Sequence, residues 1–233
     1  MGGDISTALA PACAIEMIHT YSMIHDDLPC MDDDDFRRGK PALHKAFTEG
    51  HAVLTGDYLL TFPFEIISRD LILTPDQKID LIRLLSRASG GDGMIGGQIM
   101  DMELKKGVEL GELRSLHQLK TGALFTAAIE FGAILSYASE TEQEILRGFS
   151  SELGISFQIL DDILDVTACK EKRGSEVSSD QKNNKETYLS LLGLEKAKKE
   201  LDRHRDKCLN WLKKLEKDTT LLEVIMSHHF RCQ

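Results

Sequence analysis

Apolar residues recur at helical spacing along almost the whole chain, and no run of short alternating strands interrupts them. The stretch Ile5–His25 is apolar with this spacing and predicts a long helix. Thr74 followed by Pro75 predicts a helix start, with the threonine as N-cap and the proline at the first helical position. We therefore predict an all-α fold, with residues 1–233 forming a single domain.

Further along the chain, two segments predict helices and one predicts a loop. Thr141 predicts a helix start, because Glu144 three residues later completes a capping box. Residues 170–187 are polar without periodicity and predict a surface loop. Residues 193–217 are charged and amphipathic, which predicts a helix with one buried face.

Two apolar or glycine-rich segments can each be interpreted in two ways. Thr121–Ser139 is similar to a membrane span, but Glu130 lies at its centre, where hydrocarbon would penalise a charge. Its length and small residues favour a buried core helix, so we expect no membrane span. The glycines at 90–97 are similar to a phosphate loop, but no strand precedes them, and we favour close helix packing.

The balance of charge argues against one class of main partner. The chain has 28 Lys and Arg against 38 Asp and Glu, a net charge of −10, which argues against nucleic acid as the partner. Small phosphorylated ligands stay possible, because metal ions can bridge them to an acidic site. The cysteines form no C-x-x-C pair, and their odd number of five indicates a reduced intracellular protein. We expect a cytoplasmic location, with a plastid location left open because the N-terminus is short.

One acidic cluster lies in F-Q-I-L-D-D-I-L-D-V, residues 157–166. On a helix, Asp161 and Asp165 would lie about 40° apart, and Asp162 and Asp165 about 60° apart. The three carboxylates would therefore share one face, while the residues between them are apolar. A carboxylate patch on a largely buried helix needs cations, and hard divalent ions accept oxygen ligands.

A second acidic cluster lies in H-D-D-L-P-C-M-D-D-D-D-F-R-R-G-K, residues 25–40. Asp26 and Asp32 would lie about 120° apart on an ideal helix. Pro29 falls between them, so we expect the helix to end or kink there and the two carboxylates to converge. For Asp33–Asp35 we favour a solvated turn or a calcium loop.

The two clusters, each at the end of an apolar helix, predict two walls of one cavity. Mg²⁺ would bridge them through a ligand rich in phosphate oxygens. Arg37, Arg38 and Lys120 would supply the remaining positive charge.

The ordered set of motifs resembles a known family. D-D-L-P-C-M-D…R-R-G-K-P resembles the first aspartate-rich motif of the trans-prenyltransferases, which make short-chain isoprenyl diphosphates, and F-Q-I-L-D-D-I-L-D resembles their second. K-T-G-A at 120–123 and G-M-I-G-G-Q-I-M-D at 93–101 are similar to family segments in the expected order. The resemblance covers essentially the whole chain and implies an isoprenoid synthase-type helical bundle around a central cavity. The upstream family segment G-G-K-R-x-R-P does not occur here, so we expect the N-terminal helices to be missing.

The resemblance implies three Mg²⁺ ions in the site, with Mn²⁺ as a possible replacement. Asp26 and Asp32, supported by Asp27, would hold two ions on the allylic diphosphate. Asp161, with Asp162 and Asp165, would hold the third, with Asp180 beside it.

The resemblance also implies roles for residues outside the aspartate motifs. Arg37, Lys120 and Lys185 would contact the allylic diphosphate, and Arg38 would contact isopentenyl diphosphate. Thr121 and Gln158 would line the site of the developing carbocation. It stays open whether Lys120 is instead an ordinary surface lysine and Gln158 a core hydrogen-bonding residue. The family lysine near residue 175 is replaced by Ser175, and its substitute stays open.

The implied activity is Mg²⁺-dependent head-to-tail condensation of isopentenyl diphosphate with an allylic diphosphate. In the family that the sequence resembles, the residues just before the first motif form the floor under the growing tail, and Tyr21 would lie there, about 7.5 Å before Asp26 along a helix; it stays open whether Tyr21 is instead an ordinary core aromatic. This predicts a C15 product, farnesyl diphosphate, with C20 as the runner-up. A non-catalytic partner subunit of a heteromeric synthase and a terpene cyclase also stay open. Family members are usually homodimers, and the resemblance implies a homodimer here.

Overall fold

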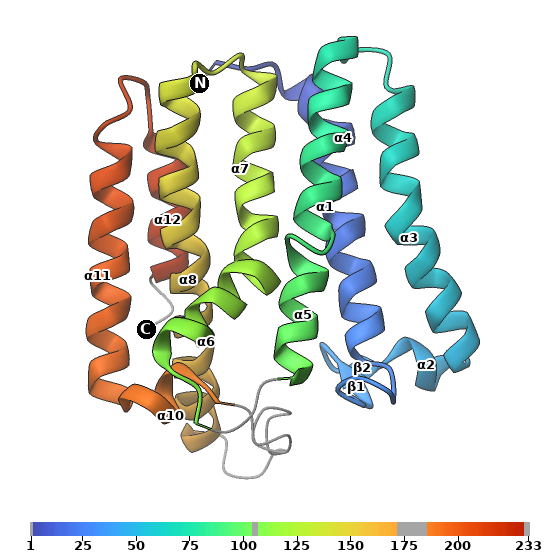
Figure 1. Cartoon of the computed structure of the whole chain (residues 1–233), viewed down its shortest axis with the longest axis vertical. Helices are drawn as coiled ribbons and strands as arrows, with labels where there is room; N and C mark the ends of the chain where they lie inside the picture. The colour runs from blue at the N-terminus through green and yellow to red at the C-terminus, as the bar shows by residue number, and fades with distance from the viewer. Residues whose placement is uncertain (1, 104–106, 172–185, 231–233) are drawn as a thin grey trace. The chain divides into compact units, whose positions relative to one another are not determined.

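The computed structural model of the protein describes residues 2–103, 107–171 and 186–230, with only the backbone of residues 168–171 (Figure 1). Most of it is helical, 77%, with almost no strands, as the sequence predicts. The chain divides into two compact units: residues 4–85, and residues 1–3 with 86–233.

The unit of residues 4–85 is built on two long helices that pack side by side, α1 (Ile5–Asp26) and α3 (Glu49–Arg69) (Figure 1). The prediction of a helix over Ile5–His25 is confirmed. Asp4 caps α1 by accepting a hydrogen bond from the backbone N–H of Ser6 at 2.9 Å. The cap and the apolar spacing together explain where α1 begins.

The two helices approach each other closely at Gly56 of α3. A Cβ atom there would lie 1.9 Å from Nε2 of His25, a distance that no real contact has. The imidazole Nε2–H of His25 donates a hydrogen bond to the carbonyl oxygen of Val53 at 3.1 Å. His25 therefore ties α1 to α3 through packing and a hydrogen bond.

Replacing Gly56 by alanine is expected to lower the free energy of unfolding by about 1–3 kcal/mol, because the methyl group would displace the His25 ring. Urea denaturation measures this. Gly132→Ala is the matched control, since Gly132 is an exposed helical glycine and a Cβ atom placed there would have no neighbour within 4 Å. The control is expected to gain about 0.5–1 kcal/mol from helix propensity. Equal effects of the two changes would show that the close approach at His25 does not exist.

A short hairpin between α1 and α3 was not predicted from the sequence. Strands β1 (Phe36–Arg37) and β2 (Lys40–Pro41) pair antiparallel, with Arg37 opposite Lys40. The two turn residues, Arg38 and Gly39, have φ angles of 52° and 74°, as a two-residue type I′ hairpin requires. The short helix α2 (Leu43–Ala46) follows the hairpin and packs on α3.

Helix α4 (Pro75–Ser89) begins where the sequence predicts. The backbone N–H of Gln77 donates to Oγ1 of Thr74 at 3.2 Å, which confirms Thr74 as the N-cap. The last residues of α4, from Ser86 on, already belong to the second unit, and helix α5 (Met94–Glu103) follows them.

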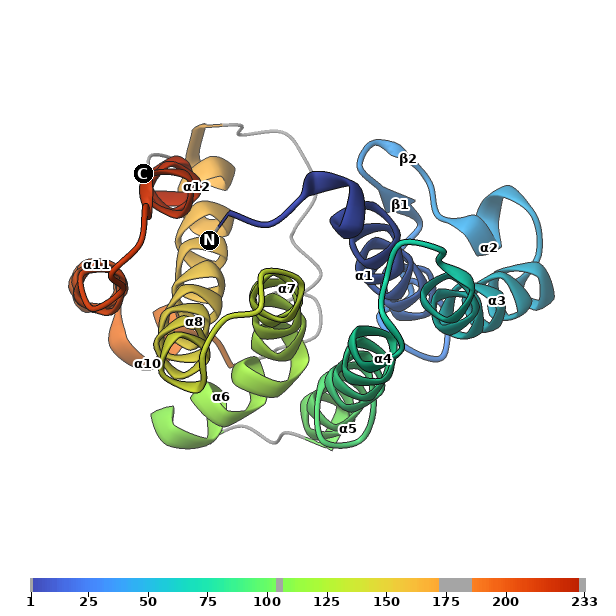
Figure 2. The same cartoon turned by 90° about the horizontal axis from the view of Figure 1, so that it is seen from above.

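The second unit surrounds one long helix, α8 (Glu140–Glu171), with α7 (Ala123–Leu135) and α11 (Leu194–Leu212) on opposite sides (Figure 2). The other elements are α6 (Leu110–His117), the π-helical turn η1 (Gln118–Gly122), α10 (Tyr188–Leu192) and α12 (Thr220–Phe230). Large side chains fill its core: Leu113, Phe149, Ile159, Tyr188, Leu201 and Leu212.

Two predicted helix boundaries are wrong. Helix α8 begins earlier than the expected cap at Thr141 requires, because Ser139 forms the capping box with Glu142. Helix α11 ends at Leu212, earlier than the pattern of residues 193–217 predicts. Within residues 170–187, which were expected to form a loop, α8 continues to Glu171, and residues 172–185 lie outside the described residues.

The apolar segment 121–139 forms a core helix after its first residues. Ala127, Phe131 and Ala133 of α7 are buried, and Glu130 forms a 2.8 Å ion pair with Arg147 of α8. Among the described residues, no helix is both long enough and apolar enough to cross a membrane.

Candidate active site

The first aspartate cluster follows the end of α1, which stops at Asp26 just before Pro29. The chain then folds back, so that the backbone N–H of Asp32 donates to the carbonyl oxygen of Asp26 at 2.9 Å. The expected end of the helix is confirmed, and the return brings the backbones of Asp26 and Asp32 together. Both side chains are partly exposed.

Asp27 is more deeply buried than Asp26 and Asp32, at 2% exposed, and its carboxylate pairs with a guanidinium. Nε of Arg37 donates to both of its oxygens, at 2.7 and 2.9 Å. This hydrogen bond raises the pKa of Arg37, and it fixes the guanidinium of β1 against the end of α1. Arg38 lies at the exposed tip of the hairpin.

The second aspartate cluster lies on α8, as predicted. Asp161 is exposed, and Asp162 and Asp165 are partly exposed. One oxygen of Asp162 accepts a hydrogen bond from the backbone N–H of Tyr188 at 2.6 Å, so this carboxylate also holds the first turn of α10. Gln158 lies three residues before Asp161 and is partly exposed. That spacing places Gln158 and Asp161 on neighbouring positions of one helix face.

Lys120 and Thr121 lie in η1, a turn with one extra residue compared with an α-helix. Nζ of Lys120 donates to Asp101 of α5 at 2.7 Å, and their side chains are 22% and 11% exposed. This ion pair within the second unit argues against an ordinary surface lysine. Gly97 makes the arrangement possible, because a Cβ atom there would lie 2.2 Å from the backbone N of Lys120.

Beside the second cluster lies an apolar hollow of about 360 Å³. One carboxylate and two imidazoles are among its lining, which comes from α7, α8 and α12: Phe125, Leu153, Phe157, Leu160, Asp161, Leu164, Ile225, His228 and His229. An acidic group next to an apolar surface suits a ligand with a charged head and an apolar tail.

Tyr21, the predicted floor residue, is 5% exposed on α1. Its ring meets His25 edge to face, with ring centroids 5.7 Å apart. Burial first, and then the charge of Asp26, raise the pKa of Tyr21 to about 12. The predicted residues Lys185, Asp180 and Ser175 lie outside the described residues.

The donor atoms present fit Mg²⁺. Asp26 and Asp32 in one unit, and Asp161 and Asp165 in the other, offer carboxylate oxygens at partly or fully exposed positions. Hard oxygen ligands of this kind are what Mg²⁺ prefers, usually together with substrate phosphates.

The family model described as Polyprenyl synthetase matches residues 2–227. The chain belongs to the polyprenyl synthetase family. It is 53% identical over 195 residues to farnesyl diphosphate synthase of Bacillus subtilis (strain 168), covering 82% of this chain and 66% of that protein. It is 45% identical to farnesyl diphosphate synthase of Geobacillus stearothermophilus, covering 97% of this chain and 77% of that protein.

A plant relative in this family is named for a different product. The chain is 46% identical to a chloroplastic geranylgeranyl pyrophosphate synthase of Capsicum annuum, covering 85% of this chain and 54% of that protein. The chain thus spans between 54% and 77% of the length of these three relatives.

Solved structures of family members confirm the fold. A crystal structure of an FPP/GFPP synthase from Zymomonas mobilis matches with a TM-score of 0.87 and 40% identity, over 98% of this chain and 78% of that chain. A geranyltransferase from Helicobacter pylori, solved with magnesium and isoprenyl diphosphate, matches with a TM-score of 0.83 and 36% identity. The match covers 97% of this chain and 74% of that chain. The expected isoprenoid synthase-type bundle is therefore confirmed.

Two residues of the polyprenyl synthetase segment G-M-I-G-G-Q-I-M-D had no assigned role in the sequence analysis. Asp101 holds Lys120, and Oε1 of Gln98 is buried with no hydrogen-bond partner among the described residues. Their place in a family-like segment was the available signal, but only the packing of α5 on η1 relates them to Lys120.

His117, at the end of α6, makes the free energy of unfolding depend on pH. Burial is the main cause that lowers its pKa from 6.5 to about 4; the charge of Lys120 lowers it further, and Asp101 opposes both. Nδ1 of His117 is buried without a hydrogen-bond partner in the described part of the chain. The unfolded chain therefore binds a proton below pH 6.5 that the folded chain does not bind until about pH 4.

Lowering the pH from 6.5 towards 4 is accordingly expected to remove on the order of 2–3 kcal/mol of stability through His117. Urea denaturation at a series of pH values measures the free energy of unfolding. Between pH 6.5 and pH 4, this free energy should fall by about 2–3 kcal/mol less for His117→Gln than for the wild type. His51→Gln, which removes an exposed imidazole, is the control and should follow the wild type. Parallel curves for wild type and His117→Gln would contradict the assignment.

Proposed function

We propose that the chain takes part in the Mg²⁺-dependent, head-to-tail condensation of isopentenyl diphosphate with an allylic diphosphate, with the C15 product farnesyl diphosphate. The observation that carries the proposal is the pair of aspartate motifs, one at the end of α1 and one on α8, in a chain 53% identical to a farnesyl diphosphate synthase. A cytoplasmic homodimer is part of the same proposal. The free thiols of Cys13, Cys30 and Cys208 suit a reducing compartment.

The first role of the side chains is to hold the charged head of the substrate. Asp26 and Asp32, with Asp27, would hold two Mg²⁺ ions on the allylic diphosphate, and Asp161, Asp162 and Asp165 would hold a third. Bound Mg²⁺ would neutralise the diphosphate and make it a better leaving group.

The cationic side chains would complete the binding of the diphosphates. Arg37 and Lys120 are held by Asp27 and Asp101, so their remaining N–H groups are oriented before a ligand binds. Donors fixed in advance stabilise the negative charge that develops on the leaving diphosphate without reorganising during the reaction. Lys185 would join them on the allylic diphosphate, and Arg38 would contact isopentenyl diphosphate.

The second role of the side chains is to protect the allylic carbocation that would form when the C–O bond to the diphosphate breaks. Thr121 of η1 and Gln158 of α8 would turn oxygen dipoles towards it, and apolar side chains would keep water away. The double bond of isopentenyl diphosphate then attacks the cation, and the departed diphosphate takes the proton. Water exclusion matters because water would otherwise trap the cation as an alcohol.

The length of the product is proposed to depend on Tyr21. Its buried aromatic ring lies on α1, five residues before Asp26, where it would stop the tail of the substrate. Tyr21→Ala is expected to extend the main product from C15 to C20, because removal of the ring opens the floor by roughly the volume of a C5 unit. Tyr21→Phe is the matched control, since it keeps the ring and should keep the C15 product. An unchanged product from Tyr21→Ala would remove this residue from the account of chain length.

A geranylgeranyl diphosphate synthase is the second candidate, favoured by the 46% identity to the Capsicum annuum protein. A partner subunit without catalytic activity is a third possibility. The presence of both aspartate motifs favours catalysis over that role.

The test is a product assay. The purified chain is incubated with Mg²⁺, labelled isopentenyl diphosphate and, separately, dimethylallyl, geranyl or farnesyl diphosphate, and the dephosphorylated alcohols are separated by length. A C15 alcohol supports the proposal, and a C20 alcohol supports the second candidate. Mg²⁺-dependent binding of the allylic diphosphate without condensation would instead support a partner subunit.

A further inference from the structure

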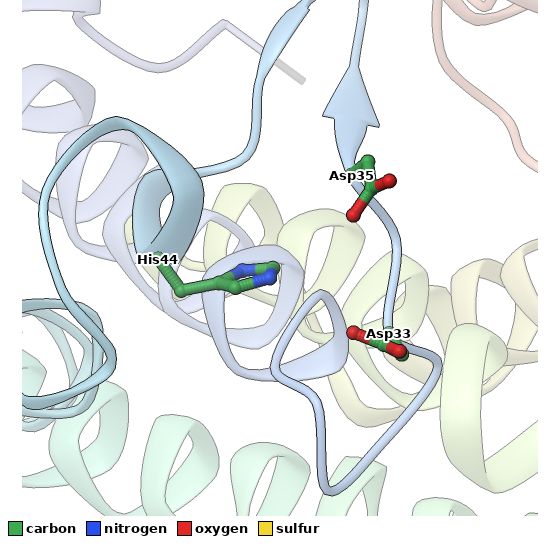
Figure 3. Close-up of side chains that lie close together, drawn as sticks. All are labelled: Asp33, Asp35 and His44. Carbon is green, nitrogen blue, oxygen red and sulfur yellow. The ribbon is translucent and has the colours of Figure 1, made fainter.

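A second group of metal-binding side chains lies beside the first aspartate motif. Asp33, Asp35 and His44 each place one ligand atom within 4.8 Å of the others. Figure 3 shows the His44 ring pointing from α2 towards the two carboxylates, which come from the segment before β1. The sequence pattern predicted a solvated turn or calcium loop for Asp33–Asp35 and no role for His44.

His44 provides independent support for a ligand at this place. The residue is only 7% exposed, and neither ring nitrogen has a hydrogen-bond partner among the described residues. A buried polar group without a hydrogen-bond partner destabilises the folded chain. A cation bound between the imidazole and the carboxylates would satisfy one nitrogen and neutralise the paired acidic groups.

We propose that Asp33, Asp35 and His44 form a site for a divalent transition-metal ion of the Zn²⁺ class. One imidazole nitrogen and two carboxylates are ligands that Zn²⁺ accepts, with water in a remaining position. Bonds of about 2.0–2.2 Å in tetrahedral geometry place ligand atoms about 3.3–3.6 Å apart. The atoms here lie within 4.8 Å of one another, and because Asp33 and Asp35 are exposed, rotation of their side chains can bring the carboxylates closer to His44.

The proposed site is chemically distinct from the aspartate motifs. Mg²⁺ prefers six oxygen ligands, whereas a buried imidazole selects for a softer ion. None of the three ligands is among the carboxylates assigned to Mg²⁺. Lys45 pairs with Asp35 at 2.8 Å, but its side chain is 42% exposed and can move away when a doubly charged ion binds.

The place of the site in the chain suggests what the ion would do. Asp35 directly precedes β1, and His44 follows β2, so the ligands stand on either side of the hairpin that carries Arg37 and Arg38. The backbone N–H of Ala42 already donates to the carbonyl oxygen of Asp35 at 2.9 Å and closes the base of this hairpin. A bound ion would link the segments on either side of the hairpin a second time, and it would slow the local opening of the hairpin.

Zn²⁺ binding to the metal-free, full 233-residue chain tests the proposal, with Mg²⁺ in large excess to occupy the aspartate motifs. A chromophoric chelator that competes for Zn²⁺ reports its affinity, and amide hydrogen exchange reports protection of residues 33–44. One equivalent is expected to bind and to slow exchange in this segment about tenfold or more. No binding in the presence of Mg²⁺, or binding without local protection, would overturn the proposal.

Variants assign the ligands. Asp33→Asn/Asp35→Asn is expected to weaken Zn²⁺ binding at least about tenfold, and because both side chains are exposed the variant should fold. His44→Gln should have the same effect. The control Asp57→Asn/Asp76→Asn removes two exposed carboxylates from α3 and α4 and should bind as the wild type does.

One further variant separates the proposed site from the Mg²⁺ motif. Asp26→Asn/Asp32→Asn should retain Zn²⁺ binding, because neither residue is a ligand in this site. Loss of Zn²⁺ with that variant, or its retention by Asp33→Asn/Asp35→Asn, would show that the ion binds in the aspartate motif and would overturn the proposal.

Discussion

Replacing Asp161 by asparagine is expected to lower kcat/KM for condensation by about 10³-fold. The amide keeps the shape of the side chain but removes the negative charge that would hold a metal ion on the leaving diphosphate. Steady-state kinetics with isopentenyl and geranyl diphosphate measure the loss. The loss should appear mainly in kcat, because the interaction strengthens as charge develops in the transition state.

Asp206→Asn is the matched control for this change. Asp206 is an exposed aspartate on α11, so the same substitution there should leave the kinetics unchanged. Wild-type kinetics of a folded Asp161→Asn protein would exclude Asp161 from the metal site.

The same substitution also tests whether the two aspartate clusters act on one substrate. Asp26→Asn alone is expected to cost a similar factor. If both carboxylates hold ions on the same diphosphate, Asp26→Asn/Asp161→Asn should lose far less than the product of the two single losses. A loss in kcat/KM for the double variant equal to the product of the two single losses would indicate that the clusters act independently.

Gly97→Ala is expected to have the second largest effect. Its Cβ atom would lie 2.2 Å from the backbone N and 2.6 Å from Cα of Lys120, and neither backbone atom can turn aside as a flexible side chain can. The turn η1 would have to move away from α5, at a cost of about 1–3 kcal/mol in stability. Because Lys120 and Thr121 move with it, kcat/KM should fall about 10²-fold.

Urea denaturation and steady-state kinetics on the same preparation measure both effects of Gly97→Ala. Gly111→Ala is the matched control here, since no atom lies within 4 Å of a Cβ placed at this position. A Gly97→Ala protein with normal activity would show that the position of η1 does not matter to the reaction.

Local signals explain what could be predicted from the sequence. The end of α1 at Asp26 follows from Pro29, and the start of α4 follows from Thr74 and Pro75. In each case the chemistry of one or two neighbouring residues decides the backbone, so a linear pattern is sufficient.

The start of α8 shows where such signals become ambiguous. Ser139 with Glu142 and Thr141 with Glu144 both satisfy the pattern of a capping box. The helix uses Ser139, whose backbone N–H also donates to Glu142 at 2.7 Å. The choice between the two starts depends on the register of α8 against its neighbours, which the local sequence does not contain.

The π-helical turn and the His44 cluster were not predictable for a related reason. The five residues of η1, Q-L-K-T-G, contain no local signal for an extra residue in the turn, and the turn packs against Gly97, more than twenty positions earlier. His44 is a single histidine without metal-ligand spacing in the sequence, and it meets Asp33 and Asp35 only after the hairpin has formed.

The left-handed backbone of Arg38 has a consequence for how this segment evolved. A residue with a Cβ atom in that conformation costs about 1 kcal/mol or more relative to glycine, and asparagine also tolerates it better than arginine. Selection for thermodynamic stability alone would favour Asn-Gly at the tip of the hairpin. If Arg38 contacts isopentenyl diphosphate, as proposed above, its guanidinium binds the ligand from a position where the turn favours arginine less than asparagine, so ligand binding and stability would oppose each other at this residue.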